Sequence, residues 1–279
     1  GIVSQSCAIR GVSVDLVDLC DADALAAAIR PGQTAMIWAE LPANPQWEMP
    51  DIQMLAAVAH GAGGLLLVDA TVATPIHCRP LEHGADLVLH SATKYLNGHG
   101  DLTAGVLVLG SVDRLPELHR FRTAAGTVLT PFGEWLLLRG LRTLAVRMER
   151  ASSTAFRIAE WLSNREEVKS VHYPGLVAHP QHQVACRQYA RGFGAMLSFR
   201  VETFAKASTL SNATKIFRVA TSLGSTESLI EHRAVTEGAG TLCPDDLIRL
   251  SIGLEDVDDL VNDLEKSLAI ACAGSDRSP

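Results

Sequence analysis

The order of short apolar runs and helix-like stretches in the first half of the chain restricts the fold most. Residues 34–40 (TAMIWAE), 65–69 (LLLVD) and 85–90 (ADLVLH) each have the length of a strand, and a helical pattern over 51–60 separates the first two. Continuous apolar runs of this kind are typical of parallel strands that helices cover on both faces. The alternation therefore predicts an α/β domain with a mostly parallel sheet.

The rest of this half predicts three more elements and then changes character. Strands are predicted over residues 11–18 (GVSVDLVD) and 102–109 (LTAGVLVL), and a helix over 21–30. From residue 131 a helical period continues to residue 163 and is interrupted by Gly140. A helical segment of this length is long enough to leave one domain and enter another.

The second half mixes short strands with helices. Strands are predicted over residues 194–202, 216–223 and 247–253, and an acidic amphipathic helix over 256–271. This pattern is typical of a smaller α+β domain. We predict a large domain over residues 1–145 and a smaller one over 146–279.

Charge and composition exclude several classes of protein. The 279 residues carry a net charge of −7 and no basic run, which argues against a nucleic-acid or anionic-membrane surface. Apolar residues make up 47% of the chain, which is too many for a disordered protein. No apolar stretch approaches the roughly 20 residues of a transmembrane helix, and the start of the chain has no signal-peptide pattern.

The cysteines and histidines predict neither disulfides nor a metal site. The six cysteines are far apart and none belongs to a CxxC pair. They are typical of reduced thiols in a cytoplasmic protein. His179 and His182 (HPQH) lack a third ligand, so they are predicted to lie in an exposed loop.

Lys94 follows the strand predicted over residues 85–90 and is preceded by two hydroxyl side chains. Burial favours the neutral form of a lysine, which is then a carbonyl-reactive amine. Ser91 and Thr93 are two residues apart, so in an extended segment their hydroxyls point to one side and could hold a phosphate. The alternative is an ordinary surface lysine beside a loop.

Other polar residues stand at predicted strand ends, where open parallel sheets bind their ligands. Asp69 ends the strand over 65–69, and Asn44 follows the strand over 34–40. Taken singly, each is also a common strand-end cap or turn residue. Arg249 lies among apolar neighbours in LIRLSIG. If its side chain faces inward, a carboxylate partner is expected, from a substrate or from an internal acid. The alternative is that Arg249 faces outward.

Residues 68–101, VDATVATP…RPLEHGADLVLHSATKYLNGHGD, resemble the pyridoxal-phosphate (PLP) enzymes of Cys/Met metabolism, the cystathionine γ-synthase and γ-lyase group. The resemblance extends to ELPANP (40–45), YPGL (173–176), TSLGSTESLIEHR (221–233) and IRLSIGLED (248–256). It covers nearly the whole chain. It implies an aspartate-aminotransferase-like fold, the type I PLP fold, in which residues 1–145 bind the cofactor.

The resemblance also implies a role for each residue at the cofactor. Lys94 would hold PLP as an internal aldimine, and Asp69 would pair with the pyridinium nitrogen. Asn44 would contact the ring hydroxyl, and Ser91 and Thr93 the phosphate. Family members carry a further N-terminal segment, with a phosphate-binding turn and a stacking Tyr, to which no residue of this sequence corresponds.

For the substrate, the resemblance implies that Arg249 binds the α-carboxylate, with Ser222 nearby. The freed Lys94 amine would move the α-proton. The expected reaction is γ-replacement or γ-elimination on a homoserine ester, cystathionine or a methionine-like amino acid, or else β-elimination on cystathionine or a cysteine conjugate. A homotetramer built from dimers is expected. A truncated, non-catalytic binding or scaffold subunit is the alternative from a different class.

Overall fold

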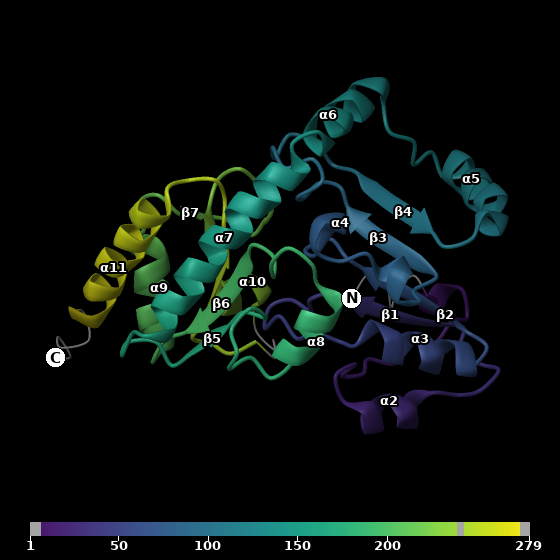
Figure 1. The fold of residues 1–279 in the computed structure, drawn as a ribbon, viewed down its shortest axis with the longest axis horizontal. Coiled ribbons are helices and arrows are strands. Elements are labelled where there is room, and N and C mark those ends of the chain that lie inside the picture. The colour runs from purple at the N-terminus through teal and green to yellow at the C-terminus, as the bar shows by residue number, and fades with distance from the viewer. Residues whose placement is uncertain (1–6, 239–242, 274–279) are drawn as a thin grey trace.

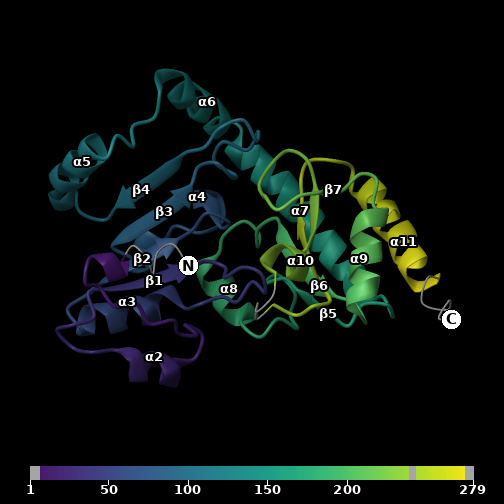
Figure 2. The ribbon, with the colours of Figure 1, turned by 180° about the vertical axis from the view of Figure 1, so that it is seen from behind.

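The computed structural model describes residues 7–238 and 243–273, which form two sheets lying side by side (Figure 1). The first has the order β1-β2-β3-β4, made of Met36–Glu40, Leu65–Asp69, Leu87–Ser91 and Gly105–Leu109. The second has the order β5-β6-β9-β8-β7, made of Ser170–His172, Met196–Arg200, Leu247–Ser251, Leu229–His232 and Arg218–Val219. Seen from behind, the two sheets remain distinct (Figure 2).

The first sheet confirms the three parallel strands predicted from the apolar runs. β1, β2 and β3 are parallel, with Glu40 opposite Asp69 at their carboxyl ends, while β4 is antiparallel to β3. Helix α3 (Ile52–Gly61) packs on β1 and β2, and the Asp51 carboxylate caps it by accepting hydrogen bonds from the backbone of Gln53 and Met54. The polar strand ends of this sheet therefore meet at one edge.

Two expectations for this sheet are wrong. Residues 11–18 form no strand, and Leu16 is 91% exposed, because no neighbouring strand pairs with this alternating segment. Helices do not cover both faces of every strand, since β1 alternates between buried and exposed residues and Trp38 is 46% exposed. In the described part of the chain, only the α3 side of β1 is packed.

The helix predicted over residues 131–163 is divided into α6 (Pro131–Leu141) and α7 (Leu144–Ser163). The break falls at Arg142 and Thr143 rather than at Gly140, which is buried inside α6. The remaining helices are α2 (Ala22–Ala28), α4 (Thr74–His77), α5 (Leu115–Ala124), α8 (His182–Gln188), α9 (Phe204–Ala213), α10 (Arg233–Glu237) and α11 (Val257–Ala273), with 3-10 turns at Pro80–His83 and Val112–Arg114. Among the described helices, none is long and apolar enough to cross a bilayer.

The second sheet packs against α7 and α9, and α11 packs on these two helices. One buried apolar cluster, which includes Phe199, Ile248 and Leu264, joins the sheet and the helices. It confirms the predicted strands near residues 194–202, 216–223 and 247–253 and the acidic C-terminal helix. Strands β5 and β8 were not predicted. The division into residues 1–145 and 146–279 stays a prediction, although α7 begins beside this boundary and packs on the second sheet.

Candidate functional site

The carboxyl ends of β2 and β3 are joined by a side chain that the sequence did not single out. Thr71 donates a hydrogen bond from its hydroxyl to Asp69 Oδ1 at 2.6 Å and another from its backbone N–H at 3.0 Å. The same hydroxyl accepts the backbone N–H of Ser91 at 2.7 Å. Asp69 Oδ2 has no hydrogen-bond partner within residues 7–238 and 243–273. Thr71 thus orients Asp69 and leaves one carboxylate oxygen for a ligand.

Lys94 lies in the turn after β3 and reaches across to the second sheet. Its Nζ donates to Ser222 Oγ at 3.0 Å, and its backbone N–H donates to Ser91 O at 3.1 Å. Partial burial and then the positive charge of Arg249 lower the pKa of the Lys94 amine below its usual value. The neutral, nucleophilic amine is therefore more accessible at physiological pH than that of a solvated lysine.

The two side chains predicted to bind the phosphate differ in whether their hydroxyls are already hydrogen-bonded. Thr93 Oγ1 accepts the backbone N–H of Ala104 at 3.0 Å and donates to Ala104 O at 3.3 Å, so it connects the turn to the start of β4. Ser91 Oγ has no partner within the described part of the chain. Ser91 can donate to an anion as it stands, whereas Thr93 must first give up the Ala104 carbonyl.

The loop after Lys94 is held from behind by α6 and α7. Arg147 of α7 is buried and donates to Tyr95 O at 2.8 Å and to Gly140 O at 2.9 Å. Gly140 of α6 touches the backbone of this loop, because a Cβ added there would lie 2.3 Å from Asn97 O. Close packing of α6 against the loop thus requires a glycine, which explains Gly140 better than a helix break.

Arg249 of β9 is 3% exposed and faces the same edge. It donates to Asn44 Oδ1 at 3.3 Å, to Thr221 O at 2.6 Å and to Ser222 O at 3.2 Å. Glu231 of β8, which stands opposite Arg249 in the sheet, forms an ion pair with it. The carboxylate partner that the sequence left open is therefore an internal acid, and Asn44 lies at the same guanidinium.

Sequence reasoning also missed Glu40, the last residue of β1. Although the residue is exposed at the end of β1, partial desolvation of its carboxyl group and the neighbouring charge of Asp69 raise the pKa of Glu40 to about 7. The signal was present, because Glu40 opens the ELPANP segment at a predicted strand end. Glu231 was indicated in a similar way, because it is an acidic residue inside the ESLIEH segment.

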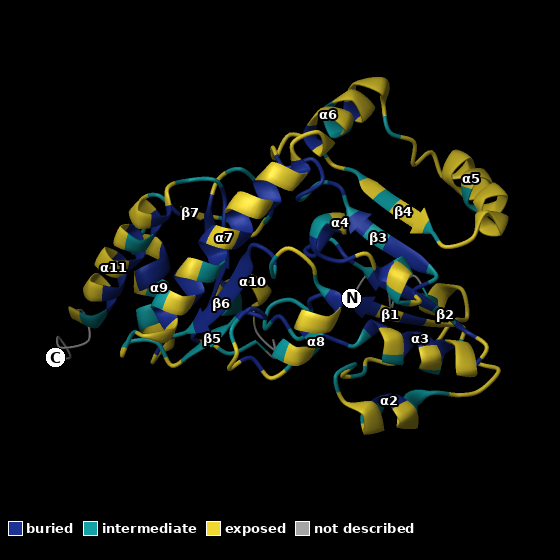
Figure 3. Ribbon diagram, in the orientation of Figure 1, coloured by how far each residue is buried: buried dark blue, intermediate teal, exposed yellow. Residues whose placement is uncertain are grey.

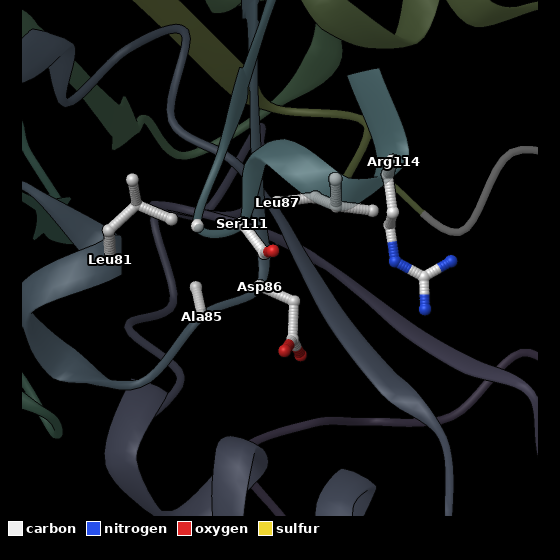
Figure 4. A pocket seen from close by; sticks show the side chains of 7 residues that line it. Leu81, Ala85, Asp86, Leu87, Ser111 and Arg114 are labelled. Carbon is white, nitrogen blue, oxygen red and sulfur yellow. The ribbon is translucent and has the colours of Figure 1, made fainter. Parts of the chain in front are cut away.

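Two other regions carry no part of this site. A hollow of about 390 Å³, lined by Asp86, Ser111 and Arg114 among others, opens at the start of β3, the end of the strand away from Lys94 (Figure 4). His179 is buried rather than in an exposed loop, and its ring Nδ1 accepts the backbone N–H of Gln181 at 3.2 Å in the turn that precedes α8. Within the described ranges, no three His, Cys, Asp or Glu side chains form a group that could hold a metal ion.

The arrangement suits a ligand that has a carbonyl, a basic ring nitrogen and an anionic group. Lys94 offers an amine with a lowered pKa, and Asp69 and Ser91 each offer an oxygen that no group in the described part of the chain binds. All three lie at or just after the carboxyl ends of the neighbouring strands β2 and β3. These are the groups that would bind PLP. The structure brings together Lys94 with Ser222, Asp69 with Ser91, and Asn44 with Arg249, while the individual roles stay predictions.

The chain belongs to the Cys/Met metabolism PLP-dependent enzyme family, which residues 2–269 match. It is 45% identical over 258 residues to a cystathionine γ-synthase of Mycobacterium tuberculosis, covering 90% of this chain and 66% of that protein. It is 43% identical over 270 residues to an L-methionine γ-lyase of Pseudomonas putida, covering 92% of this chain and 67% of that one.

The fold agrees with this membership. The crystal structure of metB from Corynebacterium glutamicum superimposes with a TM-score of 0.92 at 39% identity, covering 96% of this chain and 71% of that chain. The predicted family, fold class and cofactor are confirmed. The chain spans 66% of the length of the cystathionine γ-synthase that it matches.

Proposed function

We propose that this chain catalyses γ-replacement or γ-elimination on a homoserine ester, cystathionine or a methionine-like amino acid. The observation that carries the proposal is Lys94, whose amine has a lowered pKa, lies 3.0 Å from Ser222 Oγ and is close enough to Arg249 to respond to its charge. A non-catalytic scaffold has no physical need to keep a partly buried lysine in this setting. Relatives acting on such amino acids, at 43–45% identity, support the same choice.

Each residue then has a defined task. Lys94 Nζ would hold the cofactor and, as a free amine, would take the proton from Cα of the substrate, with Ser222 Oγ orienting the amine. Asp69 would hold the pyridine nitrogen, Asn44 the ring hydroxyl, and Ser91 and Thr93 the phosphate. When bound, PLP supplies an electron sink for negative charge on the substrate.

Arg249 completes the site by binding the α-carboxylate of the amino acid. Its guanidinium is fixed by Asn44 and by backbone carbonyls, so little ordering is needed when the substrate arrives. The fate of the substrate depends on the attacking group: a thiol gives replacement at Cγ, and its absence gives elimination. β-Elimination is the competing reaction.

We also propose that the protein is a cytoplasmic homo-oligomer, a dimer of dimers. Three large apolar side chains of α6 support assembly, because Phe132, Trp135 and Leu138 are 68%, 56% and 53% exposed. Contiguous apolar surface of this kind usually marks an interaction site. Val146, at the start of α7, is also exposed, at 71%.

The test is to incubate the 279-residue chain, loaded with PLP, with O-succinylhomoserine plus cysteine, with methionine and with cystathionine. A thioether product indicates γ-replacement, a four-carbon 2-oxo acid indicates γ-elimination, and pyruvate indicates β-elimination. Either of the first two supports the proposal. Pyruvate alone assigns the β-lyase activity instead, and no product from a loaded chain supports the scaffold.

A further inference from the structure

A row of four charged side chains runs from the proposed substrate site toward the surface. Glu231 lies between two arginines: it forms an ion pair with Arg249, and Arg233 Nη1 lies 3.2 Å and 3.3 Å from its two carboxylate oxygens. Arg233 also contacts Glu237. The exposed fractions of the side chains rise along the row, from 3% at Arg249 and 4% at Glu231 to 13% at Arg233 and 29% at Glu237.

The backbone fixes this order. Arg249 and Glu231 are directly opposite each other on the antiparallel strands β9 and β8, and Arg233 follows two residues later at the start of α10. The register of the sheet therefore keeps the backbone positions of Glu231 and Arg249 opposite each other. Any carboxylate that binds Arg249 must do so in the presence of the Glu231 charge.

The net charge of this row determines how strongly Arg249 attracts the carboxylate of a substrate. Arg249 and Glu231 alone would form a neutral buried pair, which attracts another carboxylate weakly. Arg233 adds a positive charge on the far side of Glu231 and brings the buried part of the row to a net charge of +1. Glu237 is the most exposed member, so water screens its charge more than that of the buried three.

The acids at the ends of the first sheet also act on this row. Glu40 lies close enough for Arg233 and Arg249 to oppose the rise of its pKa, and Asp69 is its neighbour in the sheet. Burial alone would lower the pKa of Arg233, yet Glu231 and Glu237 raise it above the usual value. Arg233 therefore stays charged at any pH where the protein is folded.

We propose that Glu231 and Arg233 are positioning residues: Glu231 fixes the Arg249 guanidinium, and Arg233 offsets the Glu231 charge so that Arg249 attracts the α-carboxylate of the substrate. This inference rests on the proposed role of Arg249. Arg233 touches no reacting atom and acts through its neighbour.

The test compares the binding of glycine and methylamine, which differ only in the carboxylate, by the change in cofactor absorption of the loaded protein. Arg233→Met should lower the preference for glycine about tenfold, roughly the effect of one weakened charge contact. Adding Glu231→Gln should restore the preference, because no charge is then left to offset. The matched control is Arg157→Met, which removes an exposed arginine paired with Asp258.

The outcomes separate the two proposals. If Arg249→Met keeps the preference for glycine, the role of Arg249 itself is wrong. If Arg249→Met loses it and Arg233→Met keeps it, the inference about Arg233 is overturned. If Arg233→Met and the double variant lose the preference for glycine equally, the inference is also overturned, because that result means that Arg233 has a purely structural role. Should Arg233→Met not fold, Arg233→Gln, which keeps polar contacts, takes its place with the same expectations.

Discussion

At the scale of single residues, the site depends on a threonine that performs no chemistry. Thr71 links Asp69 on β2 to the backbone of Ser91 at the end of β3, through hydrogen bonds of 2.6 Å and 2.7 Å. Asp69 and Ser91 are proposed to bind opposite ends of the cofactor. Their separation is therefore set by a side chain that lies between them.

Thr71→Val tests this link, because valine keeps the shape and removes both hydrogen bonds. We expect cofactor affinity to fall about tenfold and unfolding free energy to fall by about 1–2 kcal/mol, the usual effect of unsatisfied part-buried groups. Fluorescence titration with PLP and urea unfolding measure the two quantities. Thr127→Val, at an exposed hydroxyl with a weak 3.5 Å bond, is the control, and equal behaviour of the two variants would contradict the account.

His179 makes stability depend on pH away from the site. Burial, and then the neighbouring His172 and His182, lower its pKa to about 4. Because the folded value lies below the unfolded one, near 6.5, its contribution is present above pH 6.5 and is lost as the pH falls to 4. We expect the wild type to lose about 2 kcal/mol more stability than His179→Gln between pH 7 and 4.5. Urea unfolding at both pH values measures this difference, and substitution of the exposed His119 (His119→Gln) is the control. Equal losses of stability in the wild type and His179→Gln would refute the expectation.

The sequence was sufficient to place most chemical residues of the site, but not their partners. Lys94, Asp69 and Asn44 were found because strand ends of a parallel sheet mark the ligand edge. Thr71 and Glu231 were missed because they act on other protein groups, and the sequence does not show which residues face each other. The buried position of His179 was missed for the same reason.

At the scale of elements, α6 packs against the back of the lysine loop. Gly140 allows the contact, and Arg147 of α7 hydrogen-bonds to both the loop and α6. The position of Lys94 therefore depends on two helices that contribute no residue to the proposed chemistry.

Gly140→Ala tests that contact. Alanine normally stabilises a helix interior by about 1 kcal/mol relative to glycine, but here its Cβ would meet Asn97 O at 2.3 Å. We expect a loss of about 1–3 kcal/mol of unfolding free energy and weaker PLP binding. Gly61→Ala, in α3 with open space around it, should instead be neutral or stabilising. Thermal unfolding of both variants measures the two changes in stability. A stabilised Gly140→Ala variant would show that the close contact is absent.

The elements themselves were predictable where the pattern had one cause. Continuous apolar runs predicted β2 and β3 because both faces of a central parallel strand are buried. β1 has a similar apolar run, although it lies at the sheet edge and buries only alternate residues. The alternation over residues 11–18 predicted a strand that does not form, because a strand also needs a neighbouring strand to pair with. β8 was missed because Glu231 and His232 interrupt its apolar pattern with polar side chains whose partners, Arg249 and the Asp245 carbonyl, are close only in the folded chain.

At the scale of the whole molecule, α5 and α6 are the most exposed pair of helices in the described part of the chain, and α6 carries large apolar side chains. α5 has no buried residue, and α6 buries only two glycines, so both helices stand out from the first sheet (Figure 3). Phe132 and Trp135 stack at 5.8 Å on the outer face of α6. Surface of this kind supports the proposed homo-oligomer.

Trp135→Ser should shift the mass of the protein in solution toward smaller species, because it removes a large apolar contact from the proposed interface. The unfolding free energy of the single chain should change little, since Trp135 is already 56% exposed. Sedimentation over a range of concentrations measures the mass. Val177→Ser, at an 84% exposed loop residue, is the control, and an unchanged mass for Trp135→Ser would rule out assembly through α6.

The central claim is that Lys94 is the attachment point of the cofactor. The direct measurement is to load the 279-residue chain with PLP, reduce it with borohydride and map the modified peptide. The account predicts label on Lys94 and none in Lys94→Ala, which should still fold. Label on Lys169, Lys206, Lys215 or Lys266 instead, or covalent cofactor retained by Lys94→Ala, would contradict it.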